Sequence, residues 1–133
     1  ACRRIATAQP LEPDGLFLIH DSHHHLDRYL ARGVHGAIAN LGYLPGGDKS
    51  LITRPDTTVC ALQQVLEALV PGGRLAVVVY PGHAGAEEEV AAVEAWAASL
   101  APADFDVLRL AVVNRRKAPW LLAVARRPVE LAG

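Results

Sequence analysis

The residues with the clearest chemical potential lie in the stretch NLGYLPGGDKS, which runs from Asn40 to Ser50 after an apolar run. Its glycines and Lys-Ser ending come close to the phosphate-loop pattern G-x-x-x-x-G-K-[ST]. Asp48, however, stands between the last glycine and the lysine, where its carboxylate would face and repel a phosphate. The sequence therefore disfavours a nucleoside triphosphate site here.

Asn40 and Tyr43 favour a different chemistry, the transfer of a methyl group to an amine. Asn40 comes at the end of a predicted strand, where α/β folds bind ligands, and methyltransferases acting on amines often carry Asn-Pro-Pro-Tyr or a related motif there. The Asn oxygen accepts a hydrogen bond from the amine and aligns its lone pair, and the aromatic ring packs on the substrate. Asp48 could take up the amine's proton. A plain turn, with Asp48 in an Asx-turn or helix cap, is the alternative.

Further polar residues follow other predicted strands. Tyr80 and His83, in YPGH, are expected at the same edge of the sheet as Asn40. Arg115 and Arg116 belong to the only compact basic cluster, NRRK, which could contact RNA phosphates. An exposed loop histidine and a solvated hairpin tip are the alternatives for these two segments.

Three adjacent histidines, His23 to His25, suggest a metal site at first sight. Successive helical residues point about 100° apart, so the three side chains cannot converge on one ion. No metal site is predicted, and the transfer of a methyl group to an amine requires none.

The composition fits one globular domain, predicted over residues 1–133. Thirteen basic and fourteen acidic side chains give a net charge of −1, so nucleic acid could bind only through a local patch. No apolar run reaches about 18 residues, which argues against a membrane span. The start, ACRRIATAQP, has no secretory apolar region, and the two cysteines fit free thiols in a reducing cytoplasm.

Strand-like and helix-like segments alternate along the chain, which favours an α/β sheet, mostly parallel, with helices on both faces. Only RRKAP separates the last two predicted strands, too short for a crossover helix, so these should form an antiparallel hairpin. Both tryptophans are expected in the core. The predicted strands are 15–22, a short one from 35, 74–83, 105–114 and 119–127, and the predicted helices are 23–33, 54–73 and 86–102.

Three segments together resemble one family: NLGYLPGGDKS with the following TRPDTT, LVPGGRLAVVVYPGH, and NRRKAPWLLAVAR. They are similar to the bacterial class I S-adenosylmethionine-dependent methyltransferases first described as rRNA methylases, of which MnmM-like members methylate the aminomethyl group of a modified wobble uridine in tRNA. The resemblance runs from about Leu18 to Arg126. It implies a Rossmann-like sheet, S-adenosyl-L-methionine as cofactor, the tRNA anticodon region as partner, a cytoplasmic location and a possible homodimer.

The resemblance also implies roles for single residues. Near the target amine it places Asn40, Tyr43 and Asp48, and on the RNA side Tyr80, His83, Arg115 and Arg116. Near the cofactor it places Asp21, Ser22, His23, Asn40, Leu41 and Gly42. For Asp21 and Ser22 the alternative is a cap on the following helix.

The chain also departs from the family pattern. The family's glycine-rich cofactor loop and its acidic strand end have no counterpart before Asp21. In the family's strand order, 3-2-1-4-5-7-6, strands 1 and 2 are missing, so the first predicted strand would lie apart from the rest. Unpaired strand edges favour aggregation, and we expect marginal stability and weak cofactor binding. An inactive truncated domain, or an enzyme of this fold acting on rRNA or a small molecule, is the alternative function.

Overall fold

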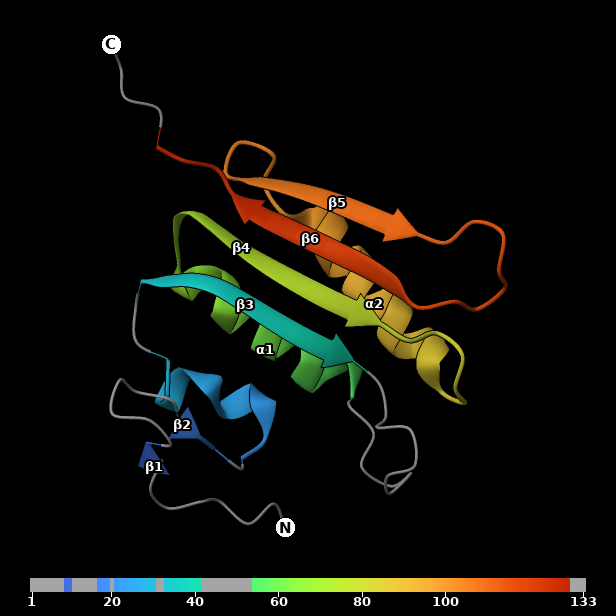
Figure 1. The fold of residues 1–133 in the computed structure, drawn as a ribbon, viewed down its shortest axis with the longest axis horizontal. Coiled ribbons are helices and arrows are strands. Elements are labelled where there is room, and N and C mark those ends of the chain that lie inside the picture. The colour runs from blue at the N-terminus through green and yellow to red at the C-terminus, as the bar shows by residue number, and fades with distance from the viewer. Residues whose placement is uncertain (1–8, 11–16, 20, 31–32, 42–53, 130–133) are drawn as a thin grey trace.

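The computed structural model describes residues 9–10, 17–19, 21–30, 33–41 and 54–129. Its main feature is a four-stranded sheet in the order β3-β4-β6-β5 (Figure 1). β3 pairs parallel with β4, and β6 pairs antiparallel with both β4 and β5. Three strands therefore share one direction and only β6 runs against them. The strands are β3 (Val34–Leu41), β4 (Leu69–Val79), β5 (Phe105–Ala111) and β6 (Trp120–Arg126).

This topology confirms the mostly parallel sheet and its antiparallel C-terminal hairpin. The order β3-β4-β6-β5 also equals the 4-5-7-6 half of the strand order that the resemblance implies. No strand among the described residues pairs with the outer edge of β3. That edge is where the missing strands of the family pattern would lie.

Two α-helices connect the strands, and local sequence sets their ends. α1 (Pro55–Ala68) has Pro55 in its first turn, where the missing amide proton costs nothing. α2 (Ala86–Ser99) begins after Gly85, whose φ of 81° suits glycine. Acidic residues fill the first turn of α2, where the helix dipole favours negative charge.

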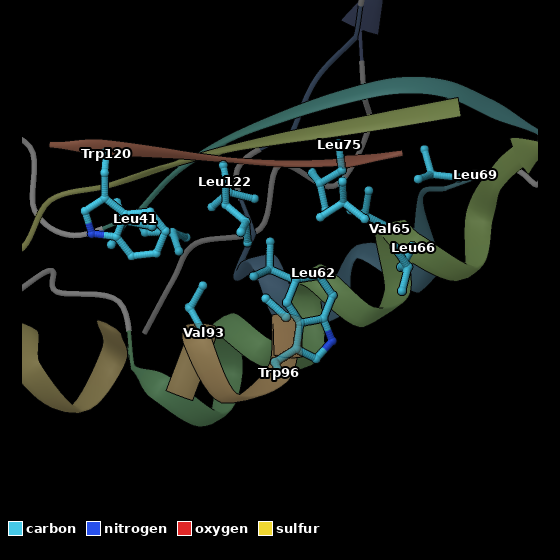
Figure 2. Close-up of a cluster of buried hydrophobic side chains, with 14 residues drawn as sticks. Leu41, Leu62, Val65, Leu66, Leu69, Leu75, Val93, Trp96, Trp120 and Leu122 are labelled. Atoms are coloured by element: carbon cyan, nitrogen blue, oxygen red, sulfur yellow. The ribbon is translucent and has the colours of Figure 1, made fainter. Parts of the chain in front are cut away.

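Both α-helices cover the same face of the sheet (Figure 2). The predicted apolar stripe of α1 is buried, and both tryptophans are core residues, with Trp96 7% and Trp120 5% exposed. Trp96 also donates from Nε1 to Gln63 Oε1 at 2.9 Å, which ties α2 to α1. The core consists of Leu41, Leu62, Val65, Leu66, Leu69, Leu75, Val77, Val79, Val93, Trp96, Ala97, Trp120, Leu122 and Val124.

The prediction of helices on both faces is wrong for the described residues, because no described helix covers the second face. We call this second surface the open face. It carries large apolar side chains in contact with solvent, with Ile38 80%, Leu108 58% and Leu110 50% exposed. By strand register it is formed by Gly36, Ile38, Asn40, Arg74, Ala76, Val78, Asp106, Leu108, Leu110, Leu121, Ala123 and Ala125.

From the open face we expect the chain to self-associate at high concentration, because contiguous exposed apolar surface favours association. Replacing Leu108 with Glu should lower the apparent mass measured by light scattering at high concentration. Val113→Glu is the matched control, since Val113 is 96% exposed but lies beyond the end of β5. Equal effects of the two substitutions would show that added charge, and not the open face, governs association.

The segment before β3 differs from its prediction. Among the described residues of the predicted strand 15–22, Phe17–Leu18 forms a strand (β2), which pairs antiparallel with Gln9–Pro10 (β1) in a separate two-stranded sheet. The helix predicted over 23–33 is the 3₁₀ helix η1 (His23–Arg28), with a kink at His25. In the part of the chain that the structure describes, no strand of the main sheet pairs with β2.

Candidate functional site

Three predicted site segments meet at one end of the main sheet (Figure 1). β3 and β4 run parallel, so Asn40, the second-last residue of β3, and Tyr80, directly after β4, lie at the same edge. β5 ends at this edge as well, because it runs in the same direction, and the hairpin containing Arg115 and Arg116 follows it. The carboxyl ends of strands are the usual ligand site of such sheets.

Asn40 pairs in register with Val78 and is exposed. Leu41, its neighbour, points to the opposite face and is buried, 6% exposed. Because successive side chains of β3 point to opposite faces, the Asn40 side chain is exposed to solvent while Leu41 anchors the strand end in the core. Gly42, Tyr43 and Asp48, also predicted for this site, lie outside the described residues.

A pocket of about 410 Å³ opens beside Asn40, between η1, β3 and α1. Three of its lining residues have polar side chains, namely His23, Asn40 and Thr58, although by strand register the side chain of Asn40 belongs to the open face. The remaining lining is aliphatic and comes from these three elements and from Leu75 of β4. Such a mainly apolar pocket with a few polar residues in its lining is typical of small-molecule sites.

Gln64 of α1 holds η1 at this pocket. Its Oε1 accepts from the Asp27 amide at 2.9 Å, and its Nε2 donates to the His24 carbonyl at 2.8 Å. One side chain thus bonds the backbone of η1 at two points, and Leu26 and Leu30 pack against the core from the same segment. The position of His23 at the pocket depends on this contact.

Asp21 organises the start of η1. Its Oδ1 accepts from the Ser22 amide at 2.8 Å and lies 3.0 Å from His25 Nδ1, and its Oδ2 accepts from the Tyr29 hydroxyl at 2.6 Å. Hydrogen bonds from His25 and then Tyr29 hold the pKa of Asp21 well below its usual 3.8. These bonds give Asp21 a structural role of the capping kind. An adenine amine would be an additional donor, which a carboxylate can still accept.

The lowered pKa of Asp21 predicts in which direction the free energy of unfolding changes as the pH falls. A carboxyl whose folded-state pKa is depressed stabilises the fold above its unfolded pKa, and that contribution disappears as the pH falls below it. The free energy of unfolding of wild type minus that of Asp21→Asn should therefore be constant near pH 5 and shrink below 3.8. Urea unfolding at several pH values measures it. A difference that grows toward low pH would contradict the assignment.

His23 is the part of η1 that reaches the pocket. Its Nε2 lies 3.3 Å from Thr57 Oγ1 at the start of α1. Burial lowers the pKa of His23 and outweighs the opposing effect of the negative Glu89, so the neutral imidazole is favoured at pH 7. Ser22, also predicted for the site, lies next to it and makes a 2.6 Å contact from Oγ to His24 Nδ1.

A buried polar pair that the sequence did not predict lies behind the pocket. Thr58 is 0% exposed and donates from Oγ1 to Glu89 Oε2 at 3.1 Å, and Glu89 is 4% exposed. The missed signal is helical spacing: Glu89 falls on one stripe with Val93 and Trp96, and Thr58 falls on one stripe with Leu62 and Val65. A polar residue on an apolar stripe indicates a buried polar contact.

The RNA-side candidates are also brought close to each other. His83 lies in the turn before α2, its Nδ1 is buried, and its carbonyl accepts from the Ala86 amide at 3.1 Å. A Cβ added to Gly82 would lie 3.5 Å from the Lys117 carbonyl, so this turn touches the β5–β6 hairpin. Arg115 and Arg116 precede Lys117 in that hairpin and are exposed.

Two absences concern the described residues alone. No three His, Cys, Asp or Glu side chains in the described ranges are grouped as metal ligands would be. No helix in this part of the chain is both long and apolar enough to cross a membrane.

Comparison with known proteins gives a consistent set of matches. The model of the family described as "Putative rRNA methylase" matches residues 2–126. A putative rRNA methylase from Clostridium thermocellum is 36% identical in sequence, with a TM-score of 0.76. The match covers 80% of this chain and 57% of the Clostridium chain. A putative methyltransferase from Streptococcus mutans, solved in complex with SAH, is 34% identical in sequence, with a TM-score of 0.72. The match covers 80% of this chain and 58% of the Streptococcus chain.

A curated relative from Arabidopsis thaliana adds a named activity. It is the chloroplastic tRNA (mnm(5)s(2)U34)-methyltransferase, 46% identical over 88 residues, which are 66% of this chain and 32% of the relative. The chain thus spans less than two thirds of each of these relatives. Because the family model covers nearly the whole chain and the sheet matches the solved relatives, the chain belongs to the family described as "Putative rRNA methylase".

Proposed function

We propose that this chain forms the substrate-facing part of an S-adenosyl-L-methionine-dependent methyltransferase that acts on an amine of RNA. The observation that carries the proposal is the position of Asn40, exposed at the carboxyl end of β3 beside the 410 Å³ pocket. Family membership and the SAH complex of the Streptococcus mutans relative support the cofactor. Residues 1–133 are proposed to fold as one domain.

The pocket suits part of such a cofactor. Its aliphatic walls match the flat, weakly polar face of a nucleoside base, and the polar residues His23 and Asn40 are both part of its lining. We assign the base side to Asp21, Ser22 and His23, and the methionine side to Asn40, Leu41 and Gly42. When bound, the cofactor supplies a methyl group activated by its sulfonium charge.

The chain's own residues would position the amine. The Asn40 side-chain oxygen accepts a hydrogen bond from the amine and keeps its lone pair directed at the reacting carbon. Tyr43 is proposed to pack on the base that carries the amine. An alkylamine is mostly protonated at neutral pH and must lose a proton to react, and Asp48 or His83 is proposed to accept it.

The finer proposal concerns the substrate. The name of the Arabidopsis relative supports the aminomethyl nitrogen of a wobble uridine in tRNA, with 5-aminomethyl-2-thiouridine becoming 5-methylaminomethyl-2-thiouridine. We therefore propose the tRNA anticodon region as partner. A cytoplasmic location and a homodimer are proposed from the family resemblance, although the name of the Arabidopsis relative places that protein in the chloroplast.

A chimera tests this function directly. The chain replaces the matching part of the Clostridium thermocellum relative, and the product is incubated with S-adenosylmethionine and tRNA that carries the aminomethyl group. Mass spectrometry of the wobble nucleoside should show the gain of one methyl group. Methylation of an rRNA fragment or a small amine instead would support the alternative substrates. Cofactor binding without any methylation would support an inactive domain.

The hairpin cluster makes a separate prediction for RNA affinity. Replacing Arg115 and Arg116 with Ala should weaken tRNA binding and flatten its salt dependence, because each lost phosphate contact lowers the slope of log K against log salt by about 0.7 to 0.9. Filter binding of the chimera at several salt concentrations measures this. Arg54→Ala, an exposed arginine outside the hairpin, is the matched control. An unchanged slope in the double variant would remove the hairpin from the RNA interface.

A further inference from the structure

The hydrogen bonds around Thr57 fix more than the position of His23. The Thr57 hydroxyl donates its single proton to the Arg54 carbonyl, 3.1 Å away, and His23 Nε2 lies 3.3 Å from the same oxygen. A hydroxyl that has given its proton to one acceptor can only accept at a second contact. As long as that proton is donated to the Arg54 carbonyl, His23 Nε2 is the donor and carries the proton of the neutral ring.

This protonation leaves Nδ1 of His23 with a lone pair. Neither the described hydrogen bonds nor the described ion pairs occupy it, and His23 lines the pocket beside Asn40. The titratable groups that act on the ring are Glu89 of α2 and His24 of η1, and burial of the ring has the larger effect. The neutral form that carries this lone pair is thus favoured at pH 7.

We propose that His23, held as the Nε2–H tautomer by Thr57, accepts a hydrogen bond at Nδ1 from a primary amino group of the ligand in this pocket. His23 then acts as a specificity-determining residue, because an acceptor cannot serve a carbonyl at the same place. The ligand half of this inference rests on the proposed function. Two amino groups have the required chemistry, the 6-amino group of the cofactor's adenine and the target aminomethyl group.

The first half is tested without any ligand. Long-range proton–nitrogen NMR spectra of the 15N-labelled chain at pH 7.5 distinguish the two tautomers, and His23→Gln assigns the signals among the six histidines. The expected result is a protonated Nε2 and a bare Nδ1. Thr57→Val should mix the tautomers, and Thr57→Ser, which keeps the hydroxyl, should not. A protonated Nδ1 in the wild-type chain would overturn the inference.

The second half uses two probes at concentrations that detect weak binding. S-adenosylhomocysteine should move the Nδ1 signal in the direction of an accepted hydrogen bond, and its 6-oxo analogue should not, if adenine is the source. If 5-aminomethyluridine moves the signal and S-adenosylhomocysteine does not, the target amine is the source.

The remaining outcomes separate this inference from the proposed function. Binding of S-adenosylhomocysteine that shifts other signals of the chain, with Nδ1 of His23 unchanged by both probes, would overturn the inference and leave the proposed function standing. A chain in which neither probe shifts any signal would overturn the ligand half of the inference alone, and methylation by the chimera would still decide the proposed function. The ligand-free spectrum would still decide the tautomer.

Discussion

Replacing Asn40 with Ala should lower the turnover number of the chimera on order of 10²-fold, roughly the cost of removing one preorganised hydrogen-bonding group from a reacting centre. The physical reason is orientation: without the side-chain oxygen the amine still enters, but its lone pair is no longer held toward the methyl group. Cofactor affinity should fall much less, because the pocket walls and His23 remain. Single-turnover methylation and calorimetry of S-adenosylhomocysteine measure the two quantities.

Two controls sharpen this experiment. Asn40→Asp keeps an acceptor oxygen of nearly the same size and should retain more turnover than Asn40→Ala. His35→Ala lies at the other end of β3, is exposed, and should change neither quantity. If Asn40→Ala turns over like wild type, Asn40 has no part in the mechanism. If turnover and cofactor affinity fall by the same factor, Asn40 serves binding and not orientation.

Local periodicity was enough to predict most of the main sheet and its helices. The stripe of α1, the apolar run of β4 and the short hairpin connection each depend on neighbours in sequence, and the structure has all three. The uncovered second face could not be predicted in this way. β4 is apolar at every position from Leu75 to Val79, but only alternate positions are buried, because coverage depends on elements elsewhere in space.

The part of the site that lies at the carboxyl ends of the strands could be predicted from the sequence. Asn40, Tyr80 and the basic hairpin meet because parallel strands end at one edge, and that rule needs no side-chain detail. The contacts that position His23 could not be predicted, because they link η1 to α1 across the intervening chain. Burial of Glu89 was also hard to predict, because Glu87, Glu88 and Glu89 all lie in the first turn of α2 and all interact favourably with the helix dipole. Only the position of Glu89 on the apolar stripe distinguishes it.

Thr58→Val should destabilise the chain by about 1–3 kcal/mol or more, the usual cost of leaving a buried polar group without its hydrogen bond, here a carboxylate. Thr58 and Glu89 are both buried, and the 3.1 Å bond between them joins α1 to α2 behind the pocket. Valine has nearly the shape of threonine, so packing is conserved and only the hydroxyl is lost. Urea unfolding followed by the fluorescence of the two buried tryptophans measures the change.

Thr58→Ser separates the hydroxyl from the methyl group of the side chain. It keeps the donor to Glu89 and loses one methyl, so it should cost about 1 kcal/mol, the transfer free energy of a buried methylene-sized group. The double variant Thr58→Val with Glu89→Leu removes both polar partners and should recover most of the loss, because two matched apolar groups leave nothing unsatisfied. A double variant no more stable than Thr58→Val would mean that Glu89 has other buried partners, and that the carboxylate contributes to the fold beyond its bond with Thr58.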